Sequence, residues 1–286
     1  MYVTKTAPEK QPYLRPLINI PNPPKQLFYR GELPAERAPT VAVVGTRKPT
    51  AYGREVGHKI TYDLVKRGVI VVSGLALGTD AIAHRAALEA GGITLAVLAN
   101  SVDSVYPRSH KALGEQIVAS GGAIISEYEP PTEARAHYFL ARNRIVSGLS
   151  DAVIIIEAAQ RSGTLSTAAH ALEQGKEVFV VPGNITSPLS AGCNALLKQG
   201  AHPITCAEDV LEVIAPELLK AQAVLPLGAT PLESKIIALL QQGIRDGDQL
   251  QQHSGAQPHE FSQAVTMMEI TGSIRALGAN QWTLGN

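Results

Sequence analysis

The chain has 286 residues, and its 25 lysines and arginines balance its 25 aspartates and glutamates. This length suits one large domain with a smaller one, and such a chain needs neither disulfides nor a metal ion to hold its core. Because the net charge is zero, the protein as a whole does not attract nucleic acid electrostatically. Any site for a polyanion must therefore be a local concentration of cations.

The two cysteines, Cys193 and Cys206, belong to no CxxC motif and have no histidine at zinc-ligand spacing. They favour a reducing compartment and argue against a metal site. The first residues include Lys5 and Pro8 instead of an apolar signal core, and apolar runs such as 152–156 are too short to span a bilayer. We therefore expect a cytoplasmic protein with no metal.

Residues 1–40 are dense in proline, which removes backbone donors and breaks helices and central strands. We expect this segment to be an extended N-terminal arm.

Short apolar runs rich in β-branched residues then alternate with segments of helical period. The runs are Val41–Val44, Val69–Val72, Thr94–Leu98, Ile124–Ile125, Val153–Ile156 and Val178–Val181. Continuously apolar strands are buried on both faces, which indicates a parallel sheet covered by helices on either side. The pattern predicts a doubly wound α/β domain over residues 41–215, with ligands expected beyond the carboxyl ends of its strands.

Two helices of this domain have clear boundaries in the sequence. Apolar residues recur every four positions from Tyr52 to Leu64, and Gly68 should follow the end of that helix in the left-handed conformation. The next helix should begin at Thr79 or Asp80, and the glycines 91–92 should close it.

A second, smaller domain is expected at the C-terminal end. Residues 216–230 contain Pro216 and Pro226 among small residues and form the predicted linker. Residues 231–286 predict three helices followed by a hairpin, which is the order of a winged helix-turn-helix. The expected elements are Leu232–Gln242, Gly247–His253, Pro258–Thr271 and the hairpin Ser273–Leu284.

The loop after the first strand carries two cations, Arg47 and Lys48, directly after Gly45 and Thr46. A dinucleotide-binding loop would have GxGxxG here, so a nicotinamide cofactor is disfavoured. Two cations at a strand exit suit an anion held by side chains. The alternative is an ordinary pair of solvated charges.

The next loop leads to Asp80 and His84, which lie four residues apart on one helix face. They could form a catalytic dyad, or the aspartate could cap the helix beside an ordinary hydrogen-bond partner. No nucleophile adjoins the pair, so we favour the structural reading.

The run from Phe139 to Arg144 combines an aromatic residue with two arginines and an asparagine. On a helix, Phe139, Arg142 and Asn143 share one face, whereas Arg144 points roughly opposite. We expect Phe139 with Arg142 or Asn143 to face an anionic ligand, and Arg144 to bind local structure, for which Asp151 is a candidate. The reverse assignment is the alternative. Phe139 could equally be a core residue or stack on a base.

The loop Arg161-Ser162-Gly163-Thr164 joins an apolar strand to a helix. Its glycine, hydroxyls and helix N-terminal N–H groups together predict a phosphate cradle, although helix capping alone would explain the serine and threonine. Lys176 lies just before the next strand and is either a ligand contact or a solvated turn residue.

Taken together, these residues resemble the DNA-processing protein A family (DprA, also called Smf). The matching motifs are Val43-Val-Gly-Thr-Arg47, Tyr52-Gly53, Ser73-Gly-Leu-Ala-x-Gly-x-Asp80-x-x-Ala-His84, Tyr106-Pro107-x-x-His110, Phe139-x-x-Arg-Asn-Arg144, Ser162-Gly-Thr164, Glu173-Gln-Gly-Lys-x-Val178 and Val181-Pro-Gly183. The joint pattern covers roughly residues 14 to 286 and is specific, although each motif alone is weak.

The resemblance implies an extended Rossmann-like domain that binds and protects single-stranded DNA and delivers it to the RecA recombinase during natural transformation. It implies a homodimer that is not an enzyme and uses no cofactor, with residues 196–214 guessed as the dimer surface. Carried over by motif, the DNA pocket would contain the residues Arg47, Phe139, Arg142, Arg144, the turn Ser162–Thr164 and Lys176.

Two points set this chain apart from many relatives. Many begin with a helical SAM-like domain, whereas this chain begins at the proline-rich segment that normally follows it. The winged helix is present in only part of the family, and from residue 230 onward three cations face five carboxylates. That balance is poor for a duplex binder and favours a protein-contact or regulatory role.

Two other functions are the alternatives. One is a nucleoside monophosphate phosphoribohydrolase on a related fold, but the double-glycine PGG loop followed by GT and a glutamate is missing. The other is a transcription factor that binds duplex DNA through the winged helix, which the acidic balance disfavours.

Overall fold

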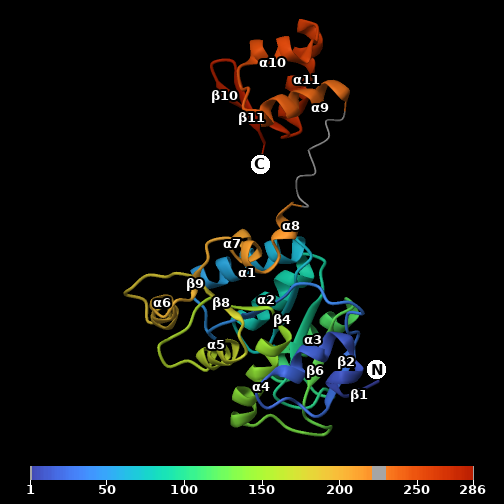
Figure 1. Ribbon diagram of the computed structural model, residues 1–286, viewed down its shortest axis with the longest axis vertical. Coiled ribbons are helices and arrows are strands. Elements are labelled where there is room, and N and C mark those ends of the chain that lie inside the picture. Colours follow the sequence, from blue (N-terminus) through green and yellow to red (C-terminus); the bar gives the residue numbers. More distant parts are fainter. Residues whose placement is uncertain (1, 221–229, 286) are drawn as a thin grey trace. The chain divides into compact units, whose positions relative to one another are not determined.

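The computed structural model describes residues 2–220 and 230–285 (Figure 1). The chain divides into two compact units, residues 1–219 and residues 220–286. Within the described residues, no helix combines the length and the apolar character that crossing a membrane requires.

The first unit contains a nine-stranded sheet in the order β1-β2-β6-β5-β4-β3-β7-β8-β9. All neighbours from β6 to β9 are parallel, and β1 and β2 are joined antiparallel at one edge. The predicted α/β class with a mostly parallel sheet is therefore confirmed. The strands are β1 (Thr4–Thr6), β2 (Leu27–Gly31), β3 (Thr40–Val44), β4 (Ile70–Ser73), β5 (Thr94–Val97), β6 (Ala123–Ser126), β7 (Ala152–Ile155), β8 (Glu177–Val180) and β9 (His202–Pro203).

The chain changes direction across the sheet at β3. From β3 it proceeds through β4 and β5 to β6 on one side, then crosses back so that β7 pairs with the other side of β3. Val44 lies opposite Ile155 at the carboxyl ends of these two strands. The loops that follow β3 and β7 therefore meet at a topological switch point, where doubly wound sheets bind their ligands.

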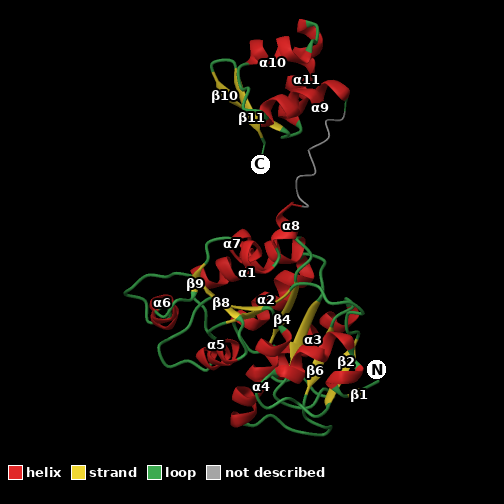
Figure 2. Ribbon diagram, in the orientation of Figure 1, coloured by secondary structure: helices red, strands yellow, loops and turns green. Residues whose placement is uncertain are grey.

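Helices cover both faces of the sheet (Figure 2). Val41 and Val43 of β3 pack in one core with Ile60, whereas Ala42 and Val44 pack in the other core with residues such as Ile145. This alternation follows from the two-residue repeat of a strand. The helices of this unit are α1 (Ala51–Lys66), α2 (Thr79–Glu89), α3 (Lys111–Ala119), α4 (Ala136–Leu149), α5 (Thr164–Glu173), α6 (Ala191–Lys198), α7 (Ala207–Ile214) and α8 (Pro216–Lys220).

The predicted boundaries of the first two helices are confirmed. The Thr50 side chain accepts from the Gly53 N–H and caps α1, and Gly68 follows with φ of 85°. Helix α2 begins at Thr79, and Gly91 follows it with φ of 76°. Both glycines adopt the left-handed conformation that residues with a Cβ adopt only at a cost.

The expected extended arm at residues 1–40 is wrong, because this segment is folded. It provides β1, β2 and two 3-10 helices, η1 (Pro8–Lys10) and η2 (Pro12–Asn19). Tyr13, Leu14 and Leu17 are fully buried in the core that α4 also joins. Proline is compatible with the first position of a helical turn, so proline density did not exclude these 3-10 turns.

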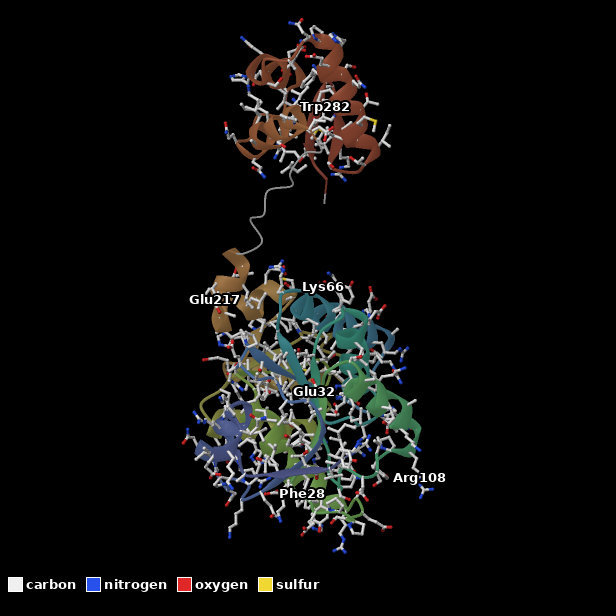
Figure 3. The ribbon with its side chains drawn as sticks, turned by 90° about the vertical axis from the view of Figure 1, so that its right-hand side faces the viewer. Phe28, Glu32, Lys66, Arg108, Glu217 and Trp282 are labelled. Carbon is white, nitrogen blue, oxygen red and sulfur yellow. The ribbon has the colours of Figure 1, made fainter. Side chains whose placement is uncertain are left out.

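The second unit has its own core. It consists of α9 (Pro231–Gln241), α10 (Gly247–Ser254), α11 (Pro258–Ile270) and an antiparallel hairpin of β10 (Ile274–Gly278) and β11 (Gln281–Leu284). Trp282 packs against this core, and Figure 3 shows it within the small unit. The three helices and the hairpin occur where the sequence predicted them. Of the predicted linker, residues 216–220 form α8, and residues 221–229 lie outside the described part.

Candidate nucleic-acid interface

A cavity of about 600 Å³ opens at the carboxyl ends of β3 and β7. The loop after β3, the start of α2, one face of α4 and the N-terminal turn of α5 surround it. The polar and aromatic residues that line it are Thr46, Arg47, Asp80, Tyr106, Phe139, Arg142, Asn143, Ser162, Thr164 and Thr167. Segments distant in sequence therefore converge on one cavity.

Backbone hydrogen bonds fix the loop that carries Arg47. The N–H of Thr46 donates to the Glu157 carbonyl at 2.8 Å, and the Thr46 carbonyl accepts from the Thr79 N–H at 3.1 Å. Gly78 lies against this loop with φ of 78°, and a Cβ there would approach the Thr46 carbonyl oxygen to 2.5 Å. The loop is thus held between the end of β7 and the start of α2, which fixes the backbone from which the Arg47 side chain extends.

Glu157 ties the start of α1 to the same edge of the sheet. Glu157 is 3% exposed, and its carboxylate accepts from the Thr50 N–H at 2.9 Å and from the Thr50 hydroxyl at 2.6 Å. A carboxylate near a helix N-terminus is stabilised by the unpaired N–H groups there. The sequence reading did not include Glu157 among the site residues, and its position directly after a buried strand was the available signal.

Arg47, Phe139 and Tyr106 form a cation–aromatic group on the rim. The Arg47 guanidinium carbon lies over the Phe139 ring, 5.2 Å from its centroid. Tyr106 meets Phe139 edge to face at 5.7 Å and is 51% exposed. One face of Phe139 is therefore covered by the guanidinium, and Tyr106 offers an additional exposed ring. Tyr106 was part of a recognised motif but was not predicted as a site residue.

Arg142 lines the cavity but is bound within the fold. It is 5% exposed, and its Nη1 donates to the carbonyl of Gly74 at 2.7 Å and to that of Val97. A Cβ on Gly74 would collide with the guanidinium, so Arg142 would have to leave its present position. Burial lowers the pKa of Arg142, and the nearby Asp80 carboxylate raises it. The sequence predicted the right face for Arg142 but did not foresee this structural role.

The Asp80 and His84 side chains have separate partners. Asp80 accepts from the N–H groups of Gly74 and Ala76 at 3.0 and 3.3 Å, and burial raises its pKa against the opposing effect of Arg142. The His84 ring is buried with Nδ1 2.7 Å from the Thr94 hydroxyl, and burial lowers its pKa to about 3. This arrangement agrees with the structural reading of the pair.

Asn143 fixes the turn that starts α5. Its Nδ2 donates to the Gly163 carbonyl at 3.3 Å and to the Ser166 hydroxyl at 2.8 Å. The Ser162 hydroxyl accepts from the Thr164 N–H at 3.2 Å. Among the hydrogen bonds between described residues, none involves the N–H of Gly163. Gly163 lines the cavity, so its N–H remains available to a phosphate there.

The structure does not bring the remaining predicted residues into the cavity lining. Lys48 and Arg161 are exposed on the two loops that flank it. Arg144 donates to the carboxylate of Glu127 at 2.6 Å and to the Asn22 carbonyl at 2.9 Å. Local binding of Arg144 was expected, but the partner is not Asp151.

Lys176 lies directly before β8, at the amino end of the sheet. The cavity opens at the carboxyl ends, so Lys176 is on the opposite edge. The motif match assigned Lys176 to the pocket, although its position just before an apolar run already indicated the amino end of a parallel strand.

The cavity has a local excess of accessible positive charge. Arg142 faces the nearby Asp80, whereas no described residue forms an ion pair with Arg47. No group of three or more His, Cys, Asp or Glu side chains suited to a metal ion occurs in residues 2–220 and 230–285. The site is thus suited to an anionic ligand held by Arg47 and the α5 turn.

Comparison with known proteins gives consistent matches. The family model for DNA recombination-mediator protein A matches residues 4–215. Protein Smf of Escherichia coli K12 is 46% identical over 189 residues, which is 66% of this chain and 50% of that protein. DNA processing protein DprA of Bacillus subtilis 168 is 41% identical over 197 residues, which is 68% of this chain and 66% of that protein.

Two solved structures share the fold. DNA processing protein A from Streptococcus pneumoniae has a TM-score of 0.69 at 38% identity, covering 75% of each chain. The protein of that name from Helicobacter pylori has a TM-score of 0.66 at 34% identity, covering 77% of this chain and 97% of that one. The chain spans half to about two thirds of the length of the first curated relatives it matches.

Proposed function

The chain belongs to the DNA recombination-mediator protein A family, and from this premise we propose that it binds single-stranded DNA in the cavity between β3 and β7. The observation that carries the proposal is the convergence of Arg47, the Phe139–Tyr106 pair and the α5 turn on one cavity. The related Helicobacter pylori structure concerns a protein that binds single-stranded DNA, which supports the proposal.

The parts of the cavity suit different parts of a nucleotide. Arg47 and the N–H of Gly163 meet backbone phosphates, since guanidinium groups and helix N-terminal donors both bind phosphate oxygens. A base stacks on the rim formed by Tyr106 and the Arg47–Phe139 pair. Lys48 and Arg161 extend the positive surface along the backbone on either side. Arg142 and Asn143 act as positioning residues.

The Asp80–His84 pair does not favour an enzymatic alternative. The His84 side chain is fully buried, and its pKa, lowered to about 3, keeps it neutral at physiological pH. Its Nδ1 is engaged by Thr94, and it faces the interior. We therefore propose a binding protein without turnover and without a cofactor, and nothing in the site favours a phosphoribohydrolase.

We propose that the bound strand is passed to the RecA recombinase in the cytoplasm during natural transformation, and that the chain acts as a homodimer. The family's description as a recombination mediator supports the first part. A mediator must release its strand, so moderate affinity raised by dimerisation suits the task. The delivery is tested by measuring RecA filament assembly on single-stranded DNA with and without this protein. The homodimer is tested by measuring the mass of the protein in solution by sedimentation.

For the second unit we propose a winged-helix role other than duplex binding. Lys235, one of its few cations, donates to the Ser254 carbonyl at 2.8 Å, while the apolar residues Met267, Ile270 and Leu277 are exposed. A full chain and a chain ending at residue 220 should bind duplex DNA equally weakly. A salt-sensitive duplex affinity present only in the full chain would contradict this role.

The test of the main proposal is fluorescence anisotropy of a labelled oligo-dT strand and a matched duplex at two salt concentrations. We expect the wild-type chain to prefer the single strand, and Arg47→Ala to weaken that binding by about tenfold and lower the salt slope by about one. Arg85→Ala, an exposed arginine on α2, is the matched control and should leave binding unchanged. Equal losses in both variants would show that Arg47 has no special role.

A further inference from the structure

A second cavity, of about 430 Å³, lies at the amino end of the sheet. It is lined by η2 together with Arg37, Gln174 and Lys176. Lys176 immediately precedes β8, whereas the first cavity lies beyond the carboxyl ends of β3 and β7. The two cavities share no lining residue, so the second is a separate site.

Three cations from three separate segments line this cavity. They are Arg15 on η2, Arg37 in the loop before β3, and Lys176 directly before β8. The adjacent carboxylate is Asp151, which accepts from Arg37 at 2.7 Å and from the Thr40 N–H at 2.8 Å. Three positive charges facing one negative charge leave a formal excess of two at the cavity.

Arg37 is held firmly in place. Its Nη2 also donates to the Leu149 carbonyl at 3.0 Å, and its guanidinium lies over the Tyr13 ring at 5.4 Å from the centroid. These contacts fix the guanidinium beside Asp151 at the cavity wall. A cation held in this way does not need to be ordered when a ligand binds, which lowers the entropic cost of binding.

Of the three cations, Arg15 and Lys176 have no hydrogen-bond or ion-pair partner among the described residues, and Lys176 is the one that is partly buried. Burial lowers the pKa of Lys176, Arg37 lowers it further, and Asp151 raises it. The pKa of Lys176 stays lowered, so Asp151, which is already paired with Arg37, does not fully compensate the desolvated ammonium, and a bound anion would add to that compensation.

We infer that this cavity binds the phosphate group of a small phosphorylated molecule, held by Arg15, Arg37 and Lys176. Two guanidinium groups and an ammonium together suit phosphate oxygens in charge and in hydrogen-bond donors. The volume lies within the range of small-molecule sites, and Pro12, Pro16 and Ile20 give it apolar walls for the rest of the ligand. A DNA strand in the first cavity lies at the opposite edge of the sheet, so a separate small ligand is favoured.

The inference is tested by isothermal titration calorimetry on the full chain with inorganic phosphate and with a deoxynucleoside monophosphate, at constant ionic strength. We expect Lys176→Gln to weaken binding of the phosphate group by about tenfold or more, since hydrogen bonds to charged groups are strong. Lys111→Gln, an exposed lysine on α3, is the matched control and should bind as the wild type does. Binding of the nucleotide but not of inorganic phosphate would still support the site and would identify the source of the phosphate.

Three results would overturn it. One is no binding of either ligand to the wild-type chain, and another is binding that Lys176→Gln leaves intact while Arg47→Ala abolishes it, which would place the ligand in the first cavity. The third is a loss of single-strand affinity in Lys176→Gln without any small-molecule binding, which would assign Lys176 to DNA. Because single-strand affinity is measured separately, failure of this site leaves the proposed DNA binding intact.

Discussion

Replacing Arg142 by methionine should destabilise the first unit strongly, because this arginine is part of the interior. Methionine keeps the aliphatic length and removes the guanidinium that donates to the carbonyls of Gly74 and Val97. It also leaves Asp80, 7% exposed, without its nearby positive charge. Removing one partner from a buried charged group costs about 3–5 kcal/mol, and we expect the free energy of unfolding to fall by that amount.

Urea unfolding can measure this loss in one unit at a time. All eight tyrosines lie in residues 1–219, and the single tryptophan, Trp282, lies in the second unit. Tyrosine fluorescence should show a midpoint lowered by about 1–3 M urea in Arg142→Met. Trp282 fluorescence should show an unchanged transition and is an internal control.

The companion variant Arg47→Met should behave in the opposite way. Arg47 is exposed, so its loss should change the free energy of unfolding by less than about 0.5 kcal/mol while weakening single-strand binding. If Arg142→Met instead kept the urea midpoint and lost DNA affinity in native buffer, Arg142 would be a ligand contact and not a stabilising part of the interior.

Three further variants test other parts of the site. Gly74→Ala should lower the free energy of unfolding by about 1–3 kcal/mol, because its Cβ collides with Arg142, and an unchanged urea midpoint would contradict that packing. The pKa of His84 is lowered to about 3 in the folded protein. Its contribution to the free energy of unfolding is therefore present above the usual pKa of histidine and is lost as the pH falls toward 3. Thermal unfolding should therefore show a loss of about 2 kcal/mol between pH 7 and pH 5 that is smaller in His84→Gln, and equal losses would exclude His84 as the cause. Asn143→Ala should release the Gly163 turn and lower single-strand affinity severalfold in anisotropy measurements with little loss of stability, whereas unchanged affinity would show that the turn needs no support from α4.

The strands and helix ends of the doubly wound sheet could be predicted because local chemistry decides them. A continuously apolar strand such as 41–44 has apolar side chains on both faces, so both faces must be covered by helices. Glycines such as Gly68 mark the left-handed backbone conformation that other residues avoid. The N-terminal segment could not be predicted in this way. Its 3-10 turns and β2 are stabilised by burial against elements that come much later in the chain, for which a single sequence carries no local signal.

The candidate site likewise contains features that the sequence could predict and features that it could not. Arg47, Phe139 and the Ser162–Thr164 turn could be predicted as neighbours, and they do line one cavity, because strand exits and helix starts are recognisable positions. The sequence could not distinguish an arginine that faces solvent from one that binds carbonyls, since both have the same spacing. The role of Arg142 depends on the carbonyls of Gly74 and Val97, and only the tertiary structure brings these next to its guanidinium.

The crossing of the chain from β6 to β7 has a consequence for synthesis on the ribosome. Glu157, which anchors the loop region near Arg47 through Thr50, is encoded 107 residues after Thr50. At typical elongation rates this interval lasts about 5–20 seconds. During that time the emerging chain displays the cation-bearing loop with neither its anchor nor the α5 turn, so a nascent chain should be unable to retain DNA until the second half of the sheet has been translated.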